Sequence, residues 1–172
     1  FLVLLLIFIF TNLVRKRNRV EESWADIEVQ MKRRYDLIPN VVETVKGYAT
    51  HEKSVLENVT NARTQAMGAN SNAEHVQAEN MLSNTLKTLF AVAENYPDLK
   101  ANANFLDLQQ ELADTENKIQ SARRFYNSNV RDYNIAIESF PANMIADTLK
   151  FSRKELFDLE EEAAKEPVHI RF

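Results

Sequence analysis

Apolar residues recur every seven positions along the first third of the chain after residue 19. Two such series run in parallel, offset by four positions, and twelve of their fourteen members are apolar. The members are Val20, Ile27, Arg34, Val41, Tyr48, Val55 and Ala62 in one series, and Trp24, Met31, Ile38, Val45, Glu52, Val59 and Ala66 in the other. This spacing predicts one long amphipathic helix with a coiled-coil-like seam. Pro39 lies inside it and predicts a bend, or alternatively a break at 36–39 that keeps the same face inward.

Two further helices are predicted beyond a polar turn at 68–74. Gly68 can end the first helix, and an Asn or Ser at 70–72 can cap the next, which we expect to run from about 73 to 95. The segment Tyr96-Pro97-Asp98 breaks it. A third helix then extends from 99 or 101 to 139. Its apolar stripe repeats at sevens: Phe105, Leu112, Ile119, Tyr126, Tyr133 and Phe140.

A fourth helix is predicted after Pro141, where proline is tolerated in a first helical turn. It would carry Ile145, Leu149, Leu156 and Leu159 at helical spacing, end at Pro167 and leave an extended tail at 167–172. The chain has only two glycines and four prolines, so few turns are expected. Four helices joined by short turns predict an all-α, antiparallel, up-and-down four-helix bundle over residues 20–166.

The first ten residues, FLVLLLIFIF, are all apolar and predict a membrane anchor over residues 1–19. Helical residues 1–14 would extend about 21 Å, whereas a bilayer core needs about twenty residues. The chain has no initiator methionine, so we expect further residues before Phe1 and a complete span that includes Phe1, Leu4, Ile7 and Phe10. A cleaved signal peptide is disfavoured because no small-residue cleavage site follows, and a buried helix is seldom apolar on every face.

A basic cluster follows this apolar run directly: Arg15, Lys16, Arg17 and Arg19. Positive charge beside a span tends to remain in the cytoplasm, which predicts a cytoplasmic bundle with the N-terminus outside. Charges on the unseen flank could reverse this orientation. The same cluster could also contact anionic lipid headgroups.

The overall charge and composition exclude several functions. The net charge is −4 and the pI is about 5.5, whereas a general nucleic-acid binder should present a basic surface. No cysteine occurs, which removes disulfides and thiolate chemistry.

Motifs for metals and catalysis are also missing from the sequence. His51, His75 and His169 lack the Glu-x-x-His and His-Glu-x-x-His spacings of bundle metal sites. No phosphate-binding glycine loop or nucleophile elbow occurs. We therefore predict no catalytic residue, no cofactor and no metal.

Polar residues interrupt the predicted helix seams. They are Arg34 and Glu52 on the first helix, Glu94 near the end of the second, and Glu116, Arg123, Asn127 and Asn134 on the third. Charges in a core are costly unless they are paired. The favoured interpretation is a set of inter-helix salt bridges that fixes register. A polar pocket or partner site is the alternative, and a hidden acid/base site is the least favoured.

Aromatic residues give a second ambiguous signal. Tyr126 and Tyr133 are seven residues apart and each precedes an Asn. The favoured interpretation is core packing, with hydroxyls that reach the surface. Together with Trp24 they would equally suit an interface.

Four stretches resemble the LemA family in order and spacing. They are RRYDLIPNVVETVKGYATHE (33–52), AENYPDLKANANFLDLQQELADTENKI (93–119), AR (122–123) and YNSNVRDYNIAIESFPANMIA (126–146). The resemblance implies a bacterial inner-membrane protein with one N-terminal span and an antiparallel helical bundle, without an established activity or cofactor. Some members resemble envelope-stress or magnetosome-membrane components. Others look like lipoproteins outside the cytoplasm, which keeps a periplasmic or extracellular bundle as an alternative.

Two functions are favoured as hypotheses and neither is enzymatic; an enzyme is the third and least favoured hypothesis. The first is a membrane-anchored scaffold or adaptor whose partners are the lipid bilayer, further copies of itself or other membrane proteins, but not nucleic acid. The alternative is a ligand- or partner-responsive regulator of envelope or stress signalling. Its pocket would consist of Arg34, Glu52, Glu94, Glu116 and Arg123.

Overall fold

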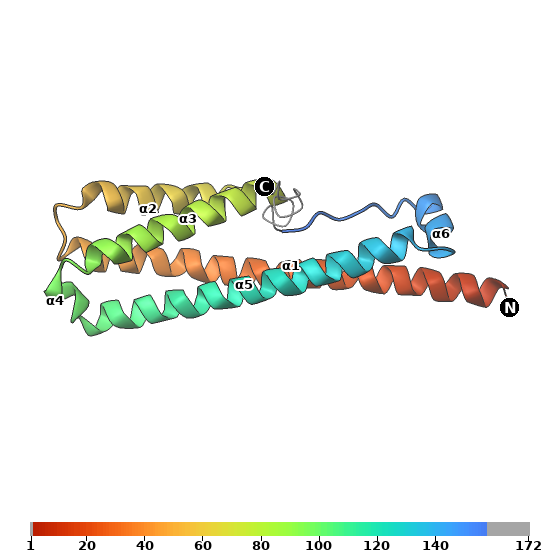
Figure 1. Cartoon of the computed structure of the whole chain (residues 1–172), viewed down its shortest axis with the longest axis horizontal. Coiled ribbons are helices and arrows are strands. Elements are labelled where there is room, and N and C mark those ends of the chain that lie inside the picture. Colours follow the sequence, from red (N-terminus) through yellow and green to blue (C-terminus); the bar gives the residue numbers. More distant parts are fainter. Residues whose placement is uncertain (1, 158–172) are drawn as a thin grey trace, which may run out of the picture. The chain divides into compact units, whose positions relative to one another are not determined.

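The computed structural model describes residues 2–157, which form helices and connecting segments without a strand (Figure 1). The helices are α1 (Leu2–Lys46), α2 (Lys53–Met67), α3 (Asn72–Ala93), α4 (Pro97–Lys100), α5 (Ala103–Glu138) and α6 (Ala142–Thr148). The predicted all-α class is confirmed. These residues divide into two compact units, one over 28–120 and one that joins the residues up to Ile27 to those from Ser121 onward.

The unit over 28–120 is a bundle of four helical segments. It contains the second part of α1, then α2, α3 and the first part of α5, and each successive long helix runs back along the previous one (Figure 1). Most of its core is apolar and draws on all four segments: Ile38, Val41 and Val45, then Val59 and Ala62, Leu82 and Leu89, and Leu112 and Ile119. Most of the predicted stripe residues therefore are buried.

The prediction of one long helix from residue 20 to residue 66 is wrong in one respect, because the structure has two helices, α1 and α2, over these residues. α1 continues through Pro39, so the break considered at 36–39 does not occur, and the chain turns instead between Lys46 and Lys53. Gly47 weakens helix propagation at this point, and backbone N–H groups of Tyr48 and Ala49 both bond the Val45 carbonyl. The seven-residue repeat persists across the turn and therefore concealed it.

α3 begins as the sequence predicted. Ser71 is its N-cap: the Ser71 hydroxyl accepts a bond from the Glu74 N–H, and the Glu74 carboxylate accepts one from the Ser71 N–H. This capping box satisfies N–H groups that have no partner inside the helix. The backbone N–H groups of Asn70 and Ser71 both donate to the Glu74 carboxylate and lower the pKa of this carboxyl.

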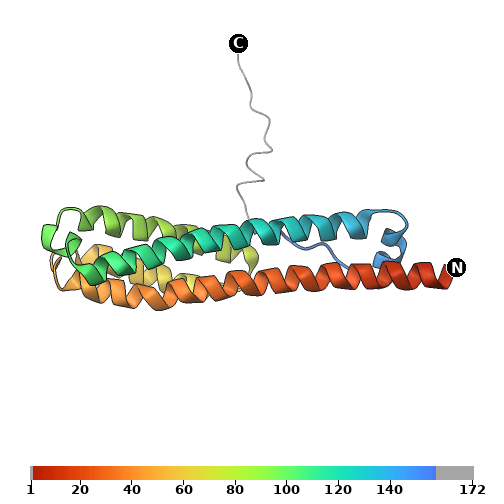
Figure 2. The ribbon, with the colours of Figure 1, turned by 90° about the horizontal axis from the view of Figure 1, so that it is seen from below.

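The fourth predicted helix is wrong beyond its first turns. α6 ends at Thr148, where Lys150 adopts φ 56° and the Phe151 N–H bonds the Ala146 carbonyl at 2.9 Å. This is a Schellman-type helix ending. Residues 151–157, here called the strap, then follow an extended course (Figure 2). Leu159, Pro167 and the predicted tail at 167–172 lie outside the described residues.

The second unit is formed by the first part of α1, the second part of α5, α6 and the strap. Leu13, Val20, Val130 and Phe157 are buried in it. Phe140, which the repeat placed on the seam, is 81% exposed because α5 ends at Glu138.

The start of α1 is strongly apolar but short. Among residues 2–157, no helix offers an apolar stretch that is sufficient to cross a membrane, so the predicted N-terminal span is not supported. Leu4, Ile7 and Phe10 are exposed on this helix. Phe1 lies outside the described residues.

Candidate functional site

A buried arginine lies at the centre of the four-segment bundle. Arg34 of α1 is 1% exposed and forms ion pairs with Glu79 of α3, which is also buried, and with Glu116 of α5. Its Nη1 donates a hydrogen bond to the Ser83 hydroxyl at 3.0 Å. A guanidinium in a protein interior is tolerated when carboxylates and hydrogen-bond acceptors surround it. The buried positive charge of Arg34 is therefore balanced by the acidic and polar side chains around it.

Tyr35 extends this cluster along α1. Its hydroxyl donates a hydrogen bond to Glu79, so Glu79 contacts two consecutive residues of α1. Burial raises the pKa of the Tyr35 phenol, and the nearby Arg34 charge lowers it in part. The phenol therefore stays protonated at neutral pH and remains a hydrogen-bond donor.

The fourth segment joins the cluster through the backbone of α1. Pro39 has no N–H, so the carbonyl of Tyr35, four residues earlier, lacks its helical donor. Arg63 of α2 supplies a substitute: its Nε donates to the Tyr35 carbonyl at 2.7 Å. Side chains from α1, α2, α3 and α5 therefore meet around Arg34 and Tyr35.

This cluster reaches solvent through one carboxylate. The Glu116 side chain is 33% exposed, whereas those of Arg34 and Glu79 are enclosed. Two carboxylates and one guanidinium leave one negative charge among these three groups. Arg63 brings a further positive charge to the backbone carbonyl of the neighbouring Tyr35. The arrangement can fix the register of the helices and present an acidic group at the surface. Within residues 2–157, no three His, Asp or Glu side chains are placed to hold a metal ion.

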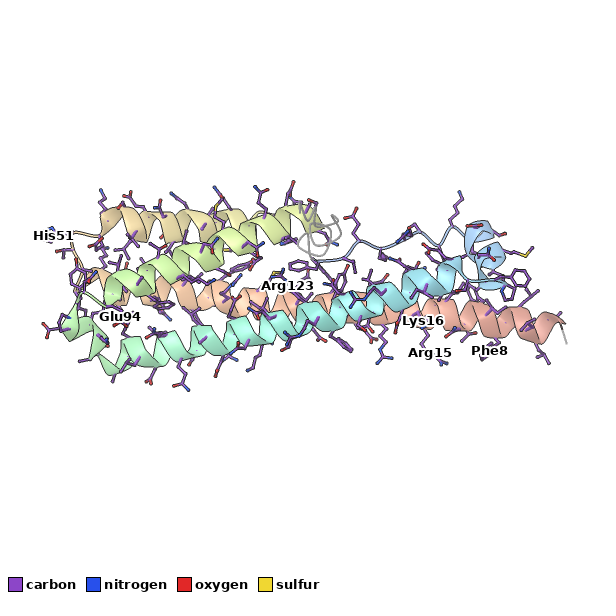
Figure 3. The ribbon with its side chains drawn as sticks, in the orientation of Figure 1. Phe8, Arg15, Lys16, His51, Glu94 and Arg123 are labelled. Atoms are coloured by element: carbon purple, nitrogen blue, oxygen red, sulfur yellow. The ribbon has the colours of Figure 1, made fainter. Side chains whose placement is uncertain are left out.

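The predicted five-residue pocket does not form as one site. Arg34 and Glu116 meet, but Glu52 at the start of α2 accepts a hydrogen bond from the Tyr96 hydroxyl at 3.0 Å, and that contact raises the Tyr96 pKa. Glu94 forms an ion pair with Lys100 at the end of the bundle that also contains His51 (Figure 3). Arg123 belongs to the other unit.

Glu79, Ser83, Tyr35 and Arg63 were missed in the sequence. Glu79 was detectable, because it lies three residues before Leu82 and seven before Leu86 on the apolar stripe of α3. An acidic residue on the buried stripe of one helix is expected to pair with a basic residue on the buried stripe of a neighbouring helix, as Glu79 does with Arg34. Arg63 left no such signal, since it binds a backbone carbonyl.

In the second unit, α5 side chains bind the backbone of the strap. The Asn134 amide both donates to the Lys154 carbonyl, at 2.9 Å, and accepts from the Lys154 N–H, at 3.0 Å. The Tyr133 hydroxyl donates to the Ser152 carbonyl at 3.1 Å. Burial raises the pKa of the Tyr133 phenol, which keeps this donor protonated.

The same pair of contacts repeats one heptad earlier. The Tyr126 hydroxyl donates to the Glu155 carbonyl at 3.0 Å, and Asn127 accepts from the Phe157 N–H at 2.8 Å. Seven helical residues rise about 10.5 Å, and three extended residues about 10 Å. The Tyr-Asn repeat therefore matches the spacing of an antiparallel extended chain.

Aromatic packing closes this unit around Phe157. Trp24 lies 5.4 Å from the Tyr126 ring and 5.5 Å from the Phe157 ring, and the Arg123 guanidinium lies 4.8 Å over Phe157. Tyr126 and Tyr133 are buried, and their hydroxyls bind strap carbonyls instead of reaching the surface.

The basic cluster follows the apolar start of α1. Figure 3 shows Phe8 and then Arg15 and Lys16 along this helix. Arg17 lies over the Phe151 ring at 5.4 Å, and Arg19 over the Phe125 ring at 5.9 Å. Both arginines pack by cation–π contacts while they remain exposed.

Comparison with known proteins identifies the chain's relatives. Protein LemA of Metamycoplasma hominis is 24% identical over 87% of this chain and 69% of its own length. Magnetosome protein MamQ of Magnetospirillum gryphiswaldense is 25% identical over 90% of this chain and 69% of its own length. Magnetosome protein MamQ 2 of Paramagnetospirillum magneticum is 24% identical over 92% of this chain and 68% of its own length. The LemA family model matches residues 23–172, and the chain therefore belongs to the LemA family.

Proposed function

We propose that the protein attaches to a membrane through the start of α1 and acts, without catalysis, as a scaffold or adaptor. One observation carries this proposal: large apolar side chains are exposed on successive turns of α1. Leu4 is 71% exposed and Phe8 is 70% exposed, one turn apart on the same side of the helix. The other exposed members are Val3, Leu5, Leu6, Ile7 and Phe10. A dense apolar surface of this kind usually contacts lipid or another protein.

The basic cluster supports lipid as the contact. Arg15, Lys16, Arg17 and Arg19 follow the apolar turns directly, and such clusters favour the cytoplasmic side and anionic headgroups. We therefore place the attachment at a bacterial inner membrane, with the bundle on the cytoplasmic side. The names of its relatives LemA and MamQ state no reaction.

Membrane washing tests the attachment. The protein should remain with membranes after high salt and after alkaline carbonate, because apolar insertion does not depend on charge screening. Leu4→Asp together with Phe8→Asp should release it. Val29→Asp is the matched control, since Val29 is an exposed apolar residue of the same helix. Complete release of the unaltered protein by salt alone would contradict the proposed insertion.

The native particle tests the scaffold. After extraction in mild detergent, light scattering combined with mass spectrometry should find several copies or a stoichiometric second membrane protein. A lone monomer across the accessible concentration range would contradict self-association and stable scaffolding.

A second candidate function rests on the half-buried Glu116. A ligand-responsive regulator would bind a cation where this carboxylate reaches the surface from the Arg34 cluster. Spermidine, an organic cation, should then raise the melting temperature of the protein by binding the folded state. Glu116→Gln should abolish the shift, whereas Glu111→Gln, on the same helix and exposed, should retain it. Equal shifts in both variants would contradict this site.

A further inference from the structure

The connection between α5 and α6 exposes apolar side chains at one end of the second unit. Residues 139–146, here called the tip, contain no charged residue. Phe140 is 81% exposed and Met144 is 64% exposed, and Leu149, just after α6, is 51% exposed. Contiguous exposed apolar side chains of this size favour a contact surface.

The tip lies beside the apolar start of α1. The Phe10 and Phe151 rings meet edge to face with centroids 6.4 Å apart, and Phe151 is bonded through its N–H to Ala146 at the end of the tip. Figures 1 and 2 both show α6 alongside the first turns of α1. Within this unit, the two uncharged apolar segments therefore occupy the same end.

Basic side chains border this apolar end. Arg17 packs over Phe151, and Lys150 follows Leu149 directly. The nearby acidic groups are Asp147, which is exposed on α6, and Glu138, which pairs with Arg153 at 3.1 Å. An apolar surface edged by cations is typical of elements that lie in the headgroup region of anionic membranes.

We propose that the tip, together with Leu149 just after α6, is a second lipid-contacting element, in which the Phe140, Met144 and Leu149 side chains enter the headgroup layer of an anionic bilayer. This inference rests on the proposed attachment through the start of α1 and extends it to a segment more than a hundred residues away in sequence. The continuity with the exposed residues of α1 and the basic border favour lipid over a second copy of the chain. Two separated insertions would fix the orientation of this unit on the membrane.

The absence of cysteine makes a direct test simple. Single variants Phe8→Cys, Met144→Cys and Ser128→Cys each carry a polarity-sensitive dye, and each native side chain is exposed. The full chain is reconstituted into vesicles of phosphatidylcholine and phosphatidylglycerol, with and without a nitroxide attached at the headgroup or along the acyl chain. Circular dichroism of each labelled variant checks that the fold is unchanged.

The dye at position 144 should shift its emission to shorter wavelength and lose intensity with the headgroup nitroxide. The dye at position 8 should be quenched more by the acyl-chain nitroxide. The dye at position 128, on the exposed face of α5, should show neither effect.

Each contrary pattern overturns a different claim. Quenching at position 8 with none at 144 would overturn the tip proposal and leave the attachment intact. Absence of quenching at both positions would overturn the attachment and the tip proposal together. An emission shift at 144 without lipid quenching would show that protein, such as a second copy, covers the tip.

Discussion

Arg34 places a full positive charge where four helical segments meet. Removal of a guanidinium from water costs several kcal/mol, and an ion pair in a protein interior only offsets this cost when its geometry and hydrogen bonds are complete. Here Glu79, Glu116 and Ser83 supply that environment. We therefore expect the cluster to select one register of the helices rather than simply to add stability.

This dependence on partners predicts a large effect at Glu79. Glu79→Ala should lower the free energy of unfolding by about 3 kcal/mol or more, because it leaves a buried charge with fewer partners. Tyr35 would also lose its acceptor. Glu111→Ala, which removes an exposed ion pair with Arg33 at 3.8 Å, should cost about 0.5 kcal/mol. Urea unfolding followed by circular dichroism measures both, and equal losses would contradict a special role for the buried pair.

His75 predicts a pH dependence of stability. Burial lowers its pKa from the ordinary 6.5, and the Glu28 and Glu74 charges raise it in part. Below 6.5 the unfolded chain therefore binds the proton more readily than the folded chain, so stability is complete above this pH and declines below it. The decline ends once the pH passes the lower folded pKa.

Urea midpoints measured at several pH values from about 8 to about 5 test this prediction. His75→Gln should make the fall in stability toward low pH less steep, and His51→Gln, which replaces an exposed imidazole, is the matched control. A profile unchanged by His75→Gln would contradict the assignment.

At the scale of elements, α1 contains a proline in its interior and nevertheless continues. An internal proline costs about 3 kcal/mol, in part because it removes one backbone hydrogen bond. Arg63 donates to the carbonyl that Pro39 leaves without a helical donor. The carbonyl that Pro39 leaves without a helical donor in α1 is thus the group that α2 binds through Arg63.

A double-mutant cycle between Pro39 and Arg63 tests this compensation. Pro39→Ala returns an N–H to the Tyr35 carbonyl, so Arg63→Ala should then cost about 1 kcal/mol less than in the original chain. Lys53→Ala, at an exposed position on α2, should cost the same in both backgrounds. Identical costs of Arg63→Ala in the two backgrounds would show that the bond does not replace the lost one.

The repeat of apolar residues predicted a helix correctly only where the same residues form one buried face of that helix. The stripes on α1, α3 and α5 were found because each buries one continuous face. The turn after Lys46 was missed, since the apolar repeat runs on through it. The strap was missed because its backbone groups bind side chains of α5. An extended segment that is fixed through its backbone needs no repeating pattern of apolar residues, so the sequence contains no signal for it.

The same limit applies to the candidate site. Arg34 and Glu116 were identified because a charge on an apolar stripe is conspicuous, and Glu79 follows the same rule. Arg63 could not be predicted from residue type, since its acceptor is a carbonyl. The sequence also could not predict that Glu52 and Arg123 lie apart from Arg34. A seven-residue repeat shows which face of a helix is buried, but not which positions along two packed helices contact each other.

At the scale of the whole molecule, α1 and α5 contribute residues to both units. Each unit nevertheless has its own closing contacts. The bundle over 28–120 is joined around Arg34, and the second unit is joined by the strap, whose Phe157 lies fully buried against Trp24. This organisation predicts that each unit can open separately.

Phe157→Ala tests that prediction. Loss of a fully buried aromatic ring should cost about 3 kcal/mol or more, which corresponds to about a hundredfold faster hydrogen exchange through the openings it promotes. The faster exchange should appear in the strap and the second part of α5, while amides of α2 and α3 remain protected. Leu82→Ala, at a fully buried position of α3, should produce the reverse distribution. If either variant instead accelerates exchange equally in both units, the two long helices transmit every opening along their length and the molecule unfolds as one.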